Sequence, residues 1–152
     1  MTNELPDEAA AFLNERLGGF NDAMKMRFVR ATKDEVVAEV TLADVHMQPY
    51  GIVHGGVHAG LIETVCSTGA ALYSMPDGRS VVGLENSTSF LRAVRGGKLR
   101  ITARPLARGR RSQVWEATVA DETGRAVASG RVRLMCLEPG SELAGAKVAA
   151  PE

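Results

Sequence analysis

The fold is decided by residues 57–75, which read VHAGLIETVCSTGAALYSM. Glu63 is the only residue with a formal charge in this stretch, and small or apolar residues surround it on both sides. A helix that is apolar all round is buried in the interior of a protein, and Pro76-Asp77-Gly78 supplies a stop signal after this one. We therefore expect a long central helix over residues 57–75 that carries one carboxylate among apolar side chains.

Strand patterns flank this helix on both sides. Residues 24–32 and 35–43 are separated by a tight turn at Lys33-Asp34, which predicts a hairpin. Four further strand patterns follow near residues 80–94, 98–107, 111–120 and 125–137. Short connections between consecutive strands favour antiparallel neighbours. The chain is therefore predicted to be an α+β domain, with one long helix packed on an antiparallel sheet.

The two ends of the chain carry weaker signals. Residues 7–17 predict a short helix that Gly18-Gly19 stops, within an N-terminal segment of residues 1–20. Residues 138–152 are expected to form a flexible tail. With 152 residues and 45% hydrophobic content, the chain has the size and composition of one globular domain, which we place at residues 1–137.

Composition and motifs exclude several classes of protein. The sequence has no charge-free apolar run of membrane-spanning length and no signal peptide, so we expect a cytoplasmic protein that does not contact a membrane. Cys66 and Cys136 fit neither a metal motif nor a disulfide framework. His54 and His58 lack the carboxylate between them that the H-E-x-x-H zinc motif needs, so no metal is expected. Motifs of nucleophile-elbow serine hydrolases and of nucleotide-binding folds are also missing.

Charge is balanced overall but uneven along the chain. The whole sequence has 18 basic and 18 acidic residues, whereas residues 79–133 hold 12 basic and 4 acidic ones. Arg108, Arg110 and Arg111 lie next to Gly109 in a turn between strands, and arginine suits bidentate contacts with phosphate. Nucleic acid is the rival ligand, but only 5% of the residues are aromatic and no base-stacking pattern accompanies the arginines. We therefore expect a smaller anionic ligand.

Glu63 is the residue most suited to catalysis. Removing a carboxylate from water is costly, and proteins rarely tolerate this cost without a partner or a task. Gly60, Glu63 and Ser67 fall on one face of the expected helix, where Gly60 leaves room and the Ser67 hydroxyl can bond the carboxylate or a water. The alternative is a carboxylate that reaches solvent or caps a neighbouring backbone group.

The loop His54-Gly55-Gly56 leads into the same helix. Free N–H groups at a helix N-terminus can hold an anion or a developing oxyanion, although an ordinary glycine turn is the alternative. Gly56 and Glu63 are separated by roughly 10 Å along a helix that rises 1.5 Å per residue, too far for both to contact one reacting carbonyl. If both serve one site, one of them comes from a second subunit. This distance predicts a homodimer with two equivalent, shared active sites.

The same residues resemble those of a known family. The stretch QPYGIVHGG at residues 48–56, with Glu63 and Ser67 after it, is similar to the hotdog-fold acyl-CoA thioesterases that use a catalytic Glu, such as the 4-hydroxybenzoyl-CoA and 1,4-dihydroxy-2-naphthoyl-CoA thioesterases. Further likeness at residues 81–85, 88–92 and 113–115 extends the resemblance over about residues 24–137. It implies the hotdog fold, in which an antiparallel β-sheet wraps the long helix. It also implies dimers that often pair into a homotetramer, and no cofactor besides the CoA of the substrate.

The resemblance also implies roles for individual residues. Glu63 would act as general base or as nucleophile, and the Gly55 N–H would polarise the thioester carbonyl. Gln48 and His54 would orient the thioester or a water, and Ser67 would assist Glu63. Phe90 lies near the acyl pocket, where some relatives carry a histidine. Candidates for binding the CoA phosphates are Arg92, Arg108, Arg110 and Arg111.

The sequence thus predicts an acyl-CoA thioesterase that acts on an aromatic or medium-chain acyl group. One alternative is an acyl-CoA hydratase or dehydratase of the same fold, and another is a non-catalytic acyl-CoA-binding protein. Dehydratases of this fold usually place their histidine in a loop rich in Pro and Phe, whereas His54 is followed by two glycines. The presence of Glu63 argues against a purely binding role.

Overall fold

The computed structural model describes residues 8–148. Two short helices, α1 (Ala10–Asn14) and α2 (Gly19–Ala23), precede the long helix α3 (Gly55–Ser74). The strands of the main sheet are β1 (Met26–Ala31), β2 (Val36–Thr41), β3 (Ser80–Phe90), β4 (Lys98–Arg108), β5 (Ser112–Ala120) and β6 (Ala126–Leu137). Smaller elements are the 3-10 turns η1 (Asp44–His46) and η2 (Met75–Asp77) and the hairpin of β7 (Glu142–Leu143) and β8 (Ala146–Lys147).

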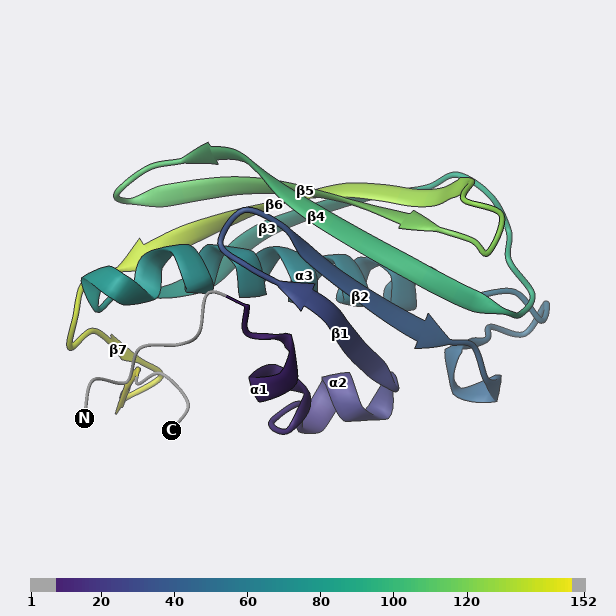
Figure 1. The fold of residues 1–152 in the computed structure, drawn as a ribbon, viewed down its shortest axis with the longest axis horizontal. Helices are drawn as coiled ribbons and strands as arrows, with labels where there is room; N and C mark the ends of the chain where they lie inside the picture. The colour runs from purple at the N-terminus through teal and green to yellow at the C-terminus, as the bar shows by residue number, and fades with distance from the viewer. Residues whose placement is uncertain (1–7, 149–152) are drawn as a thin grey trace.

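The long helix packs against one face of the six-stranded sheet (Figure 1). Its expected span of 57–75 agrees with the observed Gly55–Ser74 to within two residues. The helix side chains buried under the sheet are Val57, His58, Leu61, Ile62, Val65, Cys66, Gly69, Ala70 and Ser74. They join a single hydrophobic core with inward-facing strand residues such as Ile101, Trp115 and Leu134. The predicted α+β architecture, a long helix wrapped by an antiparallel sheet, is confirmed.

The opposite face of α3 is not buried, so the expectation of a helix covered on all sides is wrong. Ala59, Gly60, Glu63 and Ser67 on this face are only half-buried. Small and apolar residues are equally suited to a face covered by its own chain and to one that a second molecule covers. Apolar composition alone therefore could not show that this face lies open.

The sheet has the strand order β1-β2-β4-β5-β6-β3, with antiparallel pairing throughout. The predicted hairpin of β1 and β2 is confirmed, but the expectation that β3 and β4 are neighbours is wrong. Their connection spans residues 91–97, which is longer than a tight hairpin turn and lets the chain cross the sheet. As a result β4 pairs with β2, and β3 pairs with β6 and forms one edge of the sheet.

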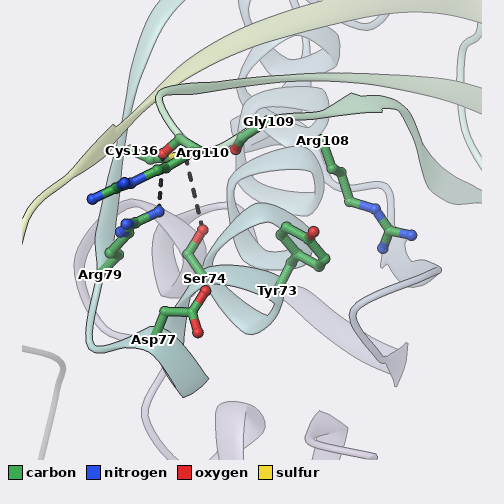
Figure 2. A pocket seen from close by; sticks show the side chains of 8 residues that line it. All are labelled: Tyr73, Ser74, Asp77, Arg79, Arg108, Gly109, Arg110 and Cys136. Atoms are coloured by element: carbon green, nitrogen blue, oxygen red, sulfur yellow. Dashed lines mark hydrogen bonds between the residues drawn. The ribbon is translucent and has the colours of Figure 1, made fainter.

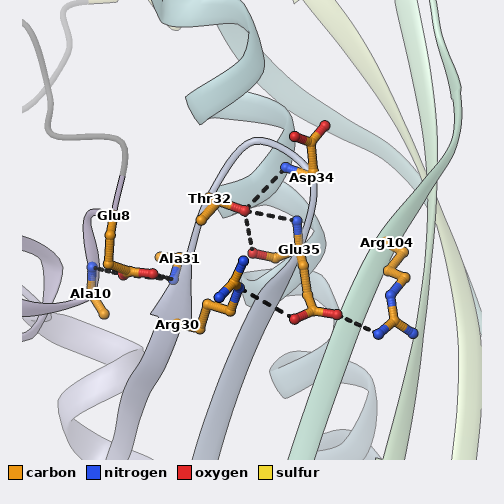
Figure 3. A network of polar contacts seen from close by, with 8 residues as sticks. All are labelled: Glu8, Ala10, Arg30, Ala31, Thr32, Asp34, Glu35 and Arg104. Carbon is orange, nitrogen blue, oxygen red and sulfur yellow. Dashed lines mark hydrogen bonds and ion pairs between the residues drawn. The ribbon is translucent and has the colours of Figure 1, made fainter.

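The N-terminal segment forms two short helices instead of the single helix expected over residues 7–17. The Glu8 carboxylate accepts hydrogen bonds from the N–H groups of Ala10 (2.7 Å) and Ala31 (2.9 Å), which ties α1 to the end of β1 (Figure 3). Gly19 starts α2 rather than ending a helix. Asp7, expected in the first helical turn, lies outside the described residues.

The turn between β1 and β2 is held by a second set of polar contacts in the same region (Figure 3). The Thr32 hydroxyl accepts from the N–H of Glu35 (3.0 Å) and donates to its carbonyl (3.1 Å). The Glu35 carboxylate pairs with Arg30 (3.3 Å) and with Arg104 on β4.

At the other end of the chain, the expected tail contains the β7–β8 hairpin, and residues 149–152 lie outside the described part.

Candidate active site

The N-terminus of α3 has one backbone donor free. His54 is the N-cap, and its Nδ1 accepts a hydrogen bond from the N–H of Gly56 (2.8 Å). This bond assigns the remaining ring proton of neutral His54 to Nε2, which can donate to a ligand. The N–H of Val57 bonds the His54 carbonyl (2.9 Å), whereas the N–H of Gly55 has no acceptor among residues 8–148. The expectation of an anion-binding helix end therefore rests on Gly55 and His54.

Gln48 lies in a tight turn directly before this helix end. The N–H of Gly51 donates to the Gln48 carbonyl (2.8 Å), and Gly51 has a φ of 69°, which favours glycine. The Gln48 side-chain oxygen accepts from the N–H of Tyr50. Arg95 closes the turn from outside, since its guanidinium donates to the carbonyl of Tyr50 (2.9 Å). The side chain of Gln48 is therefore held by its own turn with its amide N–H groups unused among the described residues.

Glu63 lies at the middle of the half-buried face of α3. Ser67, one turn further on, donates to Glu63 Oε1 (3.4 Å), the contact that the helix spacing predicted. On the other side the carboxylate lies against the backbone of β3 at Gly83, where an added Cβ would overlap Oε1. The carboxylate therefore sits between the helix and the edge strand, in a gap that a glycine leaves open.

Gly60 does not simply leave room beside Glu63, as the sequence suggested. The ring of Phe20 on α2 packs over it so closely that an added Cβ would overlap the ring. The hydroxyl of Thr64, in the next turn, donates to the side-chain oxygen of Asn21 (2.9 Å). Helix α2 is thereby fixed against the same face of α3 that carries Glu63.

A groove of about 420 Å³ opens between this face of α3 and β3. The residues lining the Glu63 groove are Ala59, Gly60, Glu63, Asn86, Thr88 and Phe90. Phe90, the last residue of β3, is 59% exposed and packs against Gly55, where an added Cβ would come 2.6 Å from the ring. The groove thus runs from the carboxylate of Glu63 toward the free N–H of Gly55 on one continuous helix.

Two residues near the groove were not identified from the sequence as site residues. Asn86 donates from its amide to Glu63 Oε2 (3.0 Å). His58 lies below Phe90, with 6.2 Å between the ring centroids, and only 3% of it is exposed. Burial lowers the pKa of His58, and its Nδ1 has no hydrogen-bond partner in the described structure. Only Asn86 had a signal in the sequence: Asn86 and Thr88 are polar residues in a stretch that otherwise reads as a strand.

The expected arginines do not form one cluster. Arg108 and Arg110 line a second cavity of about 580 Å³ at the C-terminal end of α3, and the full lining is Tyr73, Ser74, Asp77, Arg79, Arg108, Gly109, Arg110 and Cys136 (Figure 2). Arg79 also lines this arginine cavity, although it was not among the arginines expected from the sequence. Arg92 lies elsewhere, in the loop after β3, and donates to the Ala126 carbonyl (2.7 Å). Arg111 does not line the cavity.

The cations of the arginine cavity have partners within the chain. Arg108 pairs with Asp34 (2.8 Å), and its guanidinium carbon lies 4.5 Å from the centroid of the Tyr73 ring. Arg79 and Arg110 share Glu138, each at 3.6 Å. The carboxylates of these pairs are exposed, whereas Arg79 and Arg108 are partly buried. Solvent and salt screen such pairs, so the exposed carboxylates hold the guanidinium groups weakly.

Comparisons with known proteins agree with this geometry. The thioesterase superfamily matches residues 50–128, just over half of the chain. The proofreading thioesterase EntH of Cronobacter turicensis is 36% identical over 116 residues, which cover 76% of this chain and 84% of the relative. The chain belongs to the thioesterase superfamily.

Solved structures of similar proteins confirm the hotdog fold of this superfamily member. AziG from S. sahachiroi has a TM-score of 0.77 and 40% sequence identity, and the likeness covers 80% of this chain and 98% of AziG. A thioesterase from Haemophilus influenzae has a TM-score of 0.79 and 29% identity, covering 84% and 90% of the two chains. Both matches span more of the chain than residues 50–128, so the likeness extends beyond that range.

Two negative observations complete the description of this thioesterase-superfamily chain. Within residues 8–148, no helix combines the length and the apolar character needed to span a membrane. The same residues hold no cluster of three or more metal-ligating side chains.

His46, which precedes the glycine turn, is fully buried, and both of its ring nitrogens have partners: the N–H of Ala43 (2.9 Å) and the carbonyl of Met24 (2.7 Å). It therefore holds loop and helix together.

Proposed function

We propose that the protein is an acyl-CoA thioesterase that hydrolyses an aromatic or medium-chain acyl-CoA to the free acid and CoA. The observation that carries this proposal is the Glu63 carboxylate, held between α3 and the backbone of β3 at one end of a groove with an apolar far end. Phe90 and Ala59 offer this apolar surface to the acyl group. A volume of about 420 Å³ is in the range of small-molecule pockets.

Glu63 supplies the base or the nucleophile of the reaction. As general base it takes a proton from water while the water oxygen bonds the thioester carbon; the C–S bond then breaks and the thiolate takes a proton. As nucleophile it bonds the same carbon first, the C–S bond breaks and releases the thiolate, which takes a proton, and water then cleaves the resulting anhydride. Either route gives the acid and the thiol and needs the carbonyl oxygen to be stabilised as it gains charge.

That stabilisation comes from the start of α3. The free N–H of Gly55, at the positive end of the helix dipole, donates to the developing oxyanion. The Nε2–H of His54 and the side-chain amide of Gln48 orient the thioester or the water. Ser67 assists Glu63 through the hydroxyl that already contacts it.

The active sites are shared between two subunits. Gly55 and Glu63 are eight residues apart on one helix, roughly 12 Å at 1.5 Å per residue, so one thioester carbonyl cannot meet both from the same chain. Two features support a partner at this place: the half-buried face of α3 and the edge strand β3, whose second edge is unpaired in the described structure. A homodimer joined here has two equivalent sites, and dimers of this kind can pair into a homotetramer.

The phosphates of CoA bind in the arginine cavity. Arg79, Arg108 and Arg110 bring three guanidinium groups to the C-terminal end of α3, where phosphate oxygens can replace their exposed carboxylate partners. Arg92 and Arg111 lie outside the cavity of their own chain, so their contribution to CoA binding depends on the partner.

The test measures release of free CoA from a panel of aromatic and aliphatic acyl-CoAs by wild-type protein, Glu63→Gln and the control Glu85→Gln. Glu85 is on the outer face of β3 and pairs with Arg133 (3.4 Å), so its change leaves the groove intact. We expect turnover to fall by orders of magnitude in Glu63→Gln alone. Equal rates in all three proteins contradict the proposal. Hydration of an enoyl-CoA without thiol release points to the hydratase alternative, and binding without turnover to the non-catalytic one.

A further inference from the structure

The inner face of β3 is unusually polar for a strand in this sheet. From the bulge onward, its residues that face α3 are Asn86, Thr88 and Phe90, which pair with Val132, Gly130 and Ala128 of β6. The β6 partners are buried, as inner-facing positions normally are, whereas Asn86 is exposed to the groove. An amide and a hydroxyl at consecutive inner positions therefore face the carboxylate of Glu63 across the groove.

A β-bulge is the reason that Asn86 points inward. The pairing of β3 with β6 shifts between Gly83 and Glu85, so that Leu84 is the extra residue. Side chains alternate strictly along a regular strand, and with Gly83 facing α3 an unbroken strand would turn Asn86 to the outer face. The extra residue reverses this order. Bulges next to active sites commonly re-aim a side chain in this way.

The contacts of Asn86 fix both ends of its amide. The Nδ2 group donates to Glu63 Oε2 (3.0 Å) and to the carbonyl of Ala59 (3.0 Å), one turn before Glu63 on α3. The Oδ1 atom accepts from the hydroxyl of Thr88 (2.6 Å). Because the hydroxyl holds the oxygen, the NH₂ end faces the helix. The amide orientation thus follows from its neighbours on both sides.

From these contacts we infer that Asn86 is a positioning residue for Glu63, and that Thr88 orients it; the inference rests on the proposed function. Asn86 and Ser67 hold the two carboxylate oxygens from different elements, β3 and α3. Two such bonds restrict rotation of the carboxylate, so that its free lone pairs point into the groove.

The test compares Asn86→Leu, Asn86→Asp and Thr88→Val with the control Ser87→Ala. Ser87 is adjacent in sequence but pairs with Arg131 on the outer face. We expect Asn86→Leu to lower kcat by about 10- to 100-fold, while KM stays within about twofold, because the carboxylate is misplaced and substrate contacts remain. Thr88→Val should lower kcat a few-fold, and Ser87→Ala should match wild type.

A variant of the same shape separates a positioning role from a structural one. Asn86→Asp keeps the shape of the side chain but replaces the donor with an acceptor, so its kcat should fall at least as far as that of Asn86→Leu, with KM again little changed. Unchanged kcat in Asn86→Leu overturns the inference. Lower thermal stability with an unchanged kcat per folded chain overturns it as well, since it assigns Asn86 to folding alone.

A second measurement does not depend on turnover. The ¹³C signal of the Glu63 carboxyl, assigned by its loss in Glu63→Gln, is compared at one pH in wild type and Asn86→Leu. We expect its chemical shift to change in the variant, because the carboxylate loses a hydrogen-bond donor. An identical chemical shift overturns the inference even if thioester turnover supports the proposed function. A changed chemical shift in a protein that hydrolyses no thioester retains the contact and overturns the proposed function instead.

Discussion

Glu63 occupies its position because Gly83 has no side chain. The φ angle of Gly83 lies outside the left-handed region, so glycine serves here as space and not as a turn residue. A methyl group at this position would overlap Oε1 of Glu63. The position of the proposed catalytic carboxylate therefore requires a glycine on the neighbouring strand.

Gly83→Ala should lower the thioesterase rate by about 100-fold, because a displacement of the reacting group by about 1 Å has effects of this size. The control is Gly96→Ala, since an added Cβ there meets nothing within 4 Å. Steady-state kinetics and thermal unfolding of both variants measure the effect. A Gly83→Ala enzyme with the wild-type rate would mean that the carboxylate can work from another position.

The buried position of His58 predicts how the free energy of unfolding depends on pH. Burial lowers its pKa below the ordinary value of 6.5, so the unfolded chain binds a proton before the folded one does. The free energy of unfolding should therefore fall as the pH drops below about 6.5 toward the lower folded value. Urea unfolding across pH 5–8 should show this slope in wild type and a smaller one in His58→Leu. Equal slopes in the two proteins would contradict the assignment to His58.

At the scale of elements, close contact between α3 and the sheet depends on a second glycine. The ring of Trp115 on β5 lies on Gly69, and its Nε1 donates to Gln113 Oε1 (2.8 Å). The Gln113 amide in turn donates to the hydroxyl of Ser74 (2.8 Å) and to the carbonyl of Ala70 (3.2 Å). This buried network joins the middle of the sheet to the last turns of the helix.

Gly69→Ala should reduce the free energy of unfolding by about 1–3 kcal/mol, the usual effect of overpacking a core. The ring of Trp115 is fixed by its hydrogen bond, so it cannot move aside without leaving Gln113 Oε1 without its donor. Denaturant titration followed by Trp115 fluorescence measures the change. Because alanine favours helix over glycine, a stability equal to or above that of wild type would show that the core has room here.

Elements were predictable where the signal is local. The span of α3 and the strands β1, β2, β4, β5 and β6 follow from runs of alternating or apolar residues between turn residues. The position of β3 at the sheet edge did not follow, because pairing with β6 joins residues 38 to 57 positions apart in sequence. Of the candidate site, Glu63 was singled out as the one charge in an apolar helix, and Ser67 by helix spacing from it. The glycine turn was singled out because free N–H groups at a helix N-terminus can hold an anion. Asn86 was missed because the bulge at Leu84 reverses which side chains face the helix.

At the scale of the whole molecule, the thiols of Cys66 and Cys136 lie in different environments. Burial raises the pKa of the Cys66 thiol, and the charges of Glu63 and Glu116 add to this effect. Cys136 is only partly buried and lines the arginine cavity. Thiolates are the reactive form of cysteine, so the two side chains should differ in reactivity toward thiol reagents.

In native protein we expect one thiol per chain to react with a chromogenic disulfide, and both after denaturation. Cys136→Ser should leave none reactive in the native state. The S-methyl thioether of CoA, which has no free thiol to consume the reagent, should slow the reaction of Cys136 if its phosphates occupy the arginine cavity, whereas S-methyl pantetheine, which lacks phosphates, should not. Labelling that is equally fast with and without saturating S-methyl CoA would place the phosphates elsewhere.

The edge of β3 that has no partner strand among residues 8–148 makes the expected rate per chain depend on protein concentration. Asn86, Thr88 and Phe90 line the groove from the strand whose other edge is open, and the proposed site is complete only when a second chain is present. Dilution below the dissociation constant of the dimer should therefore lower the rate per chain, even though each chain stays folded. Such an enzyme would respond to its own abundance: output would rise more steeply than concentration at low expression and in direct proportion once the chains are paired.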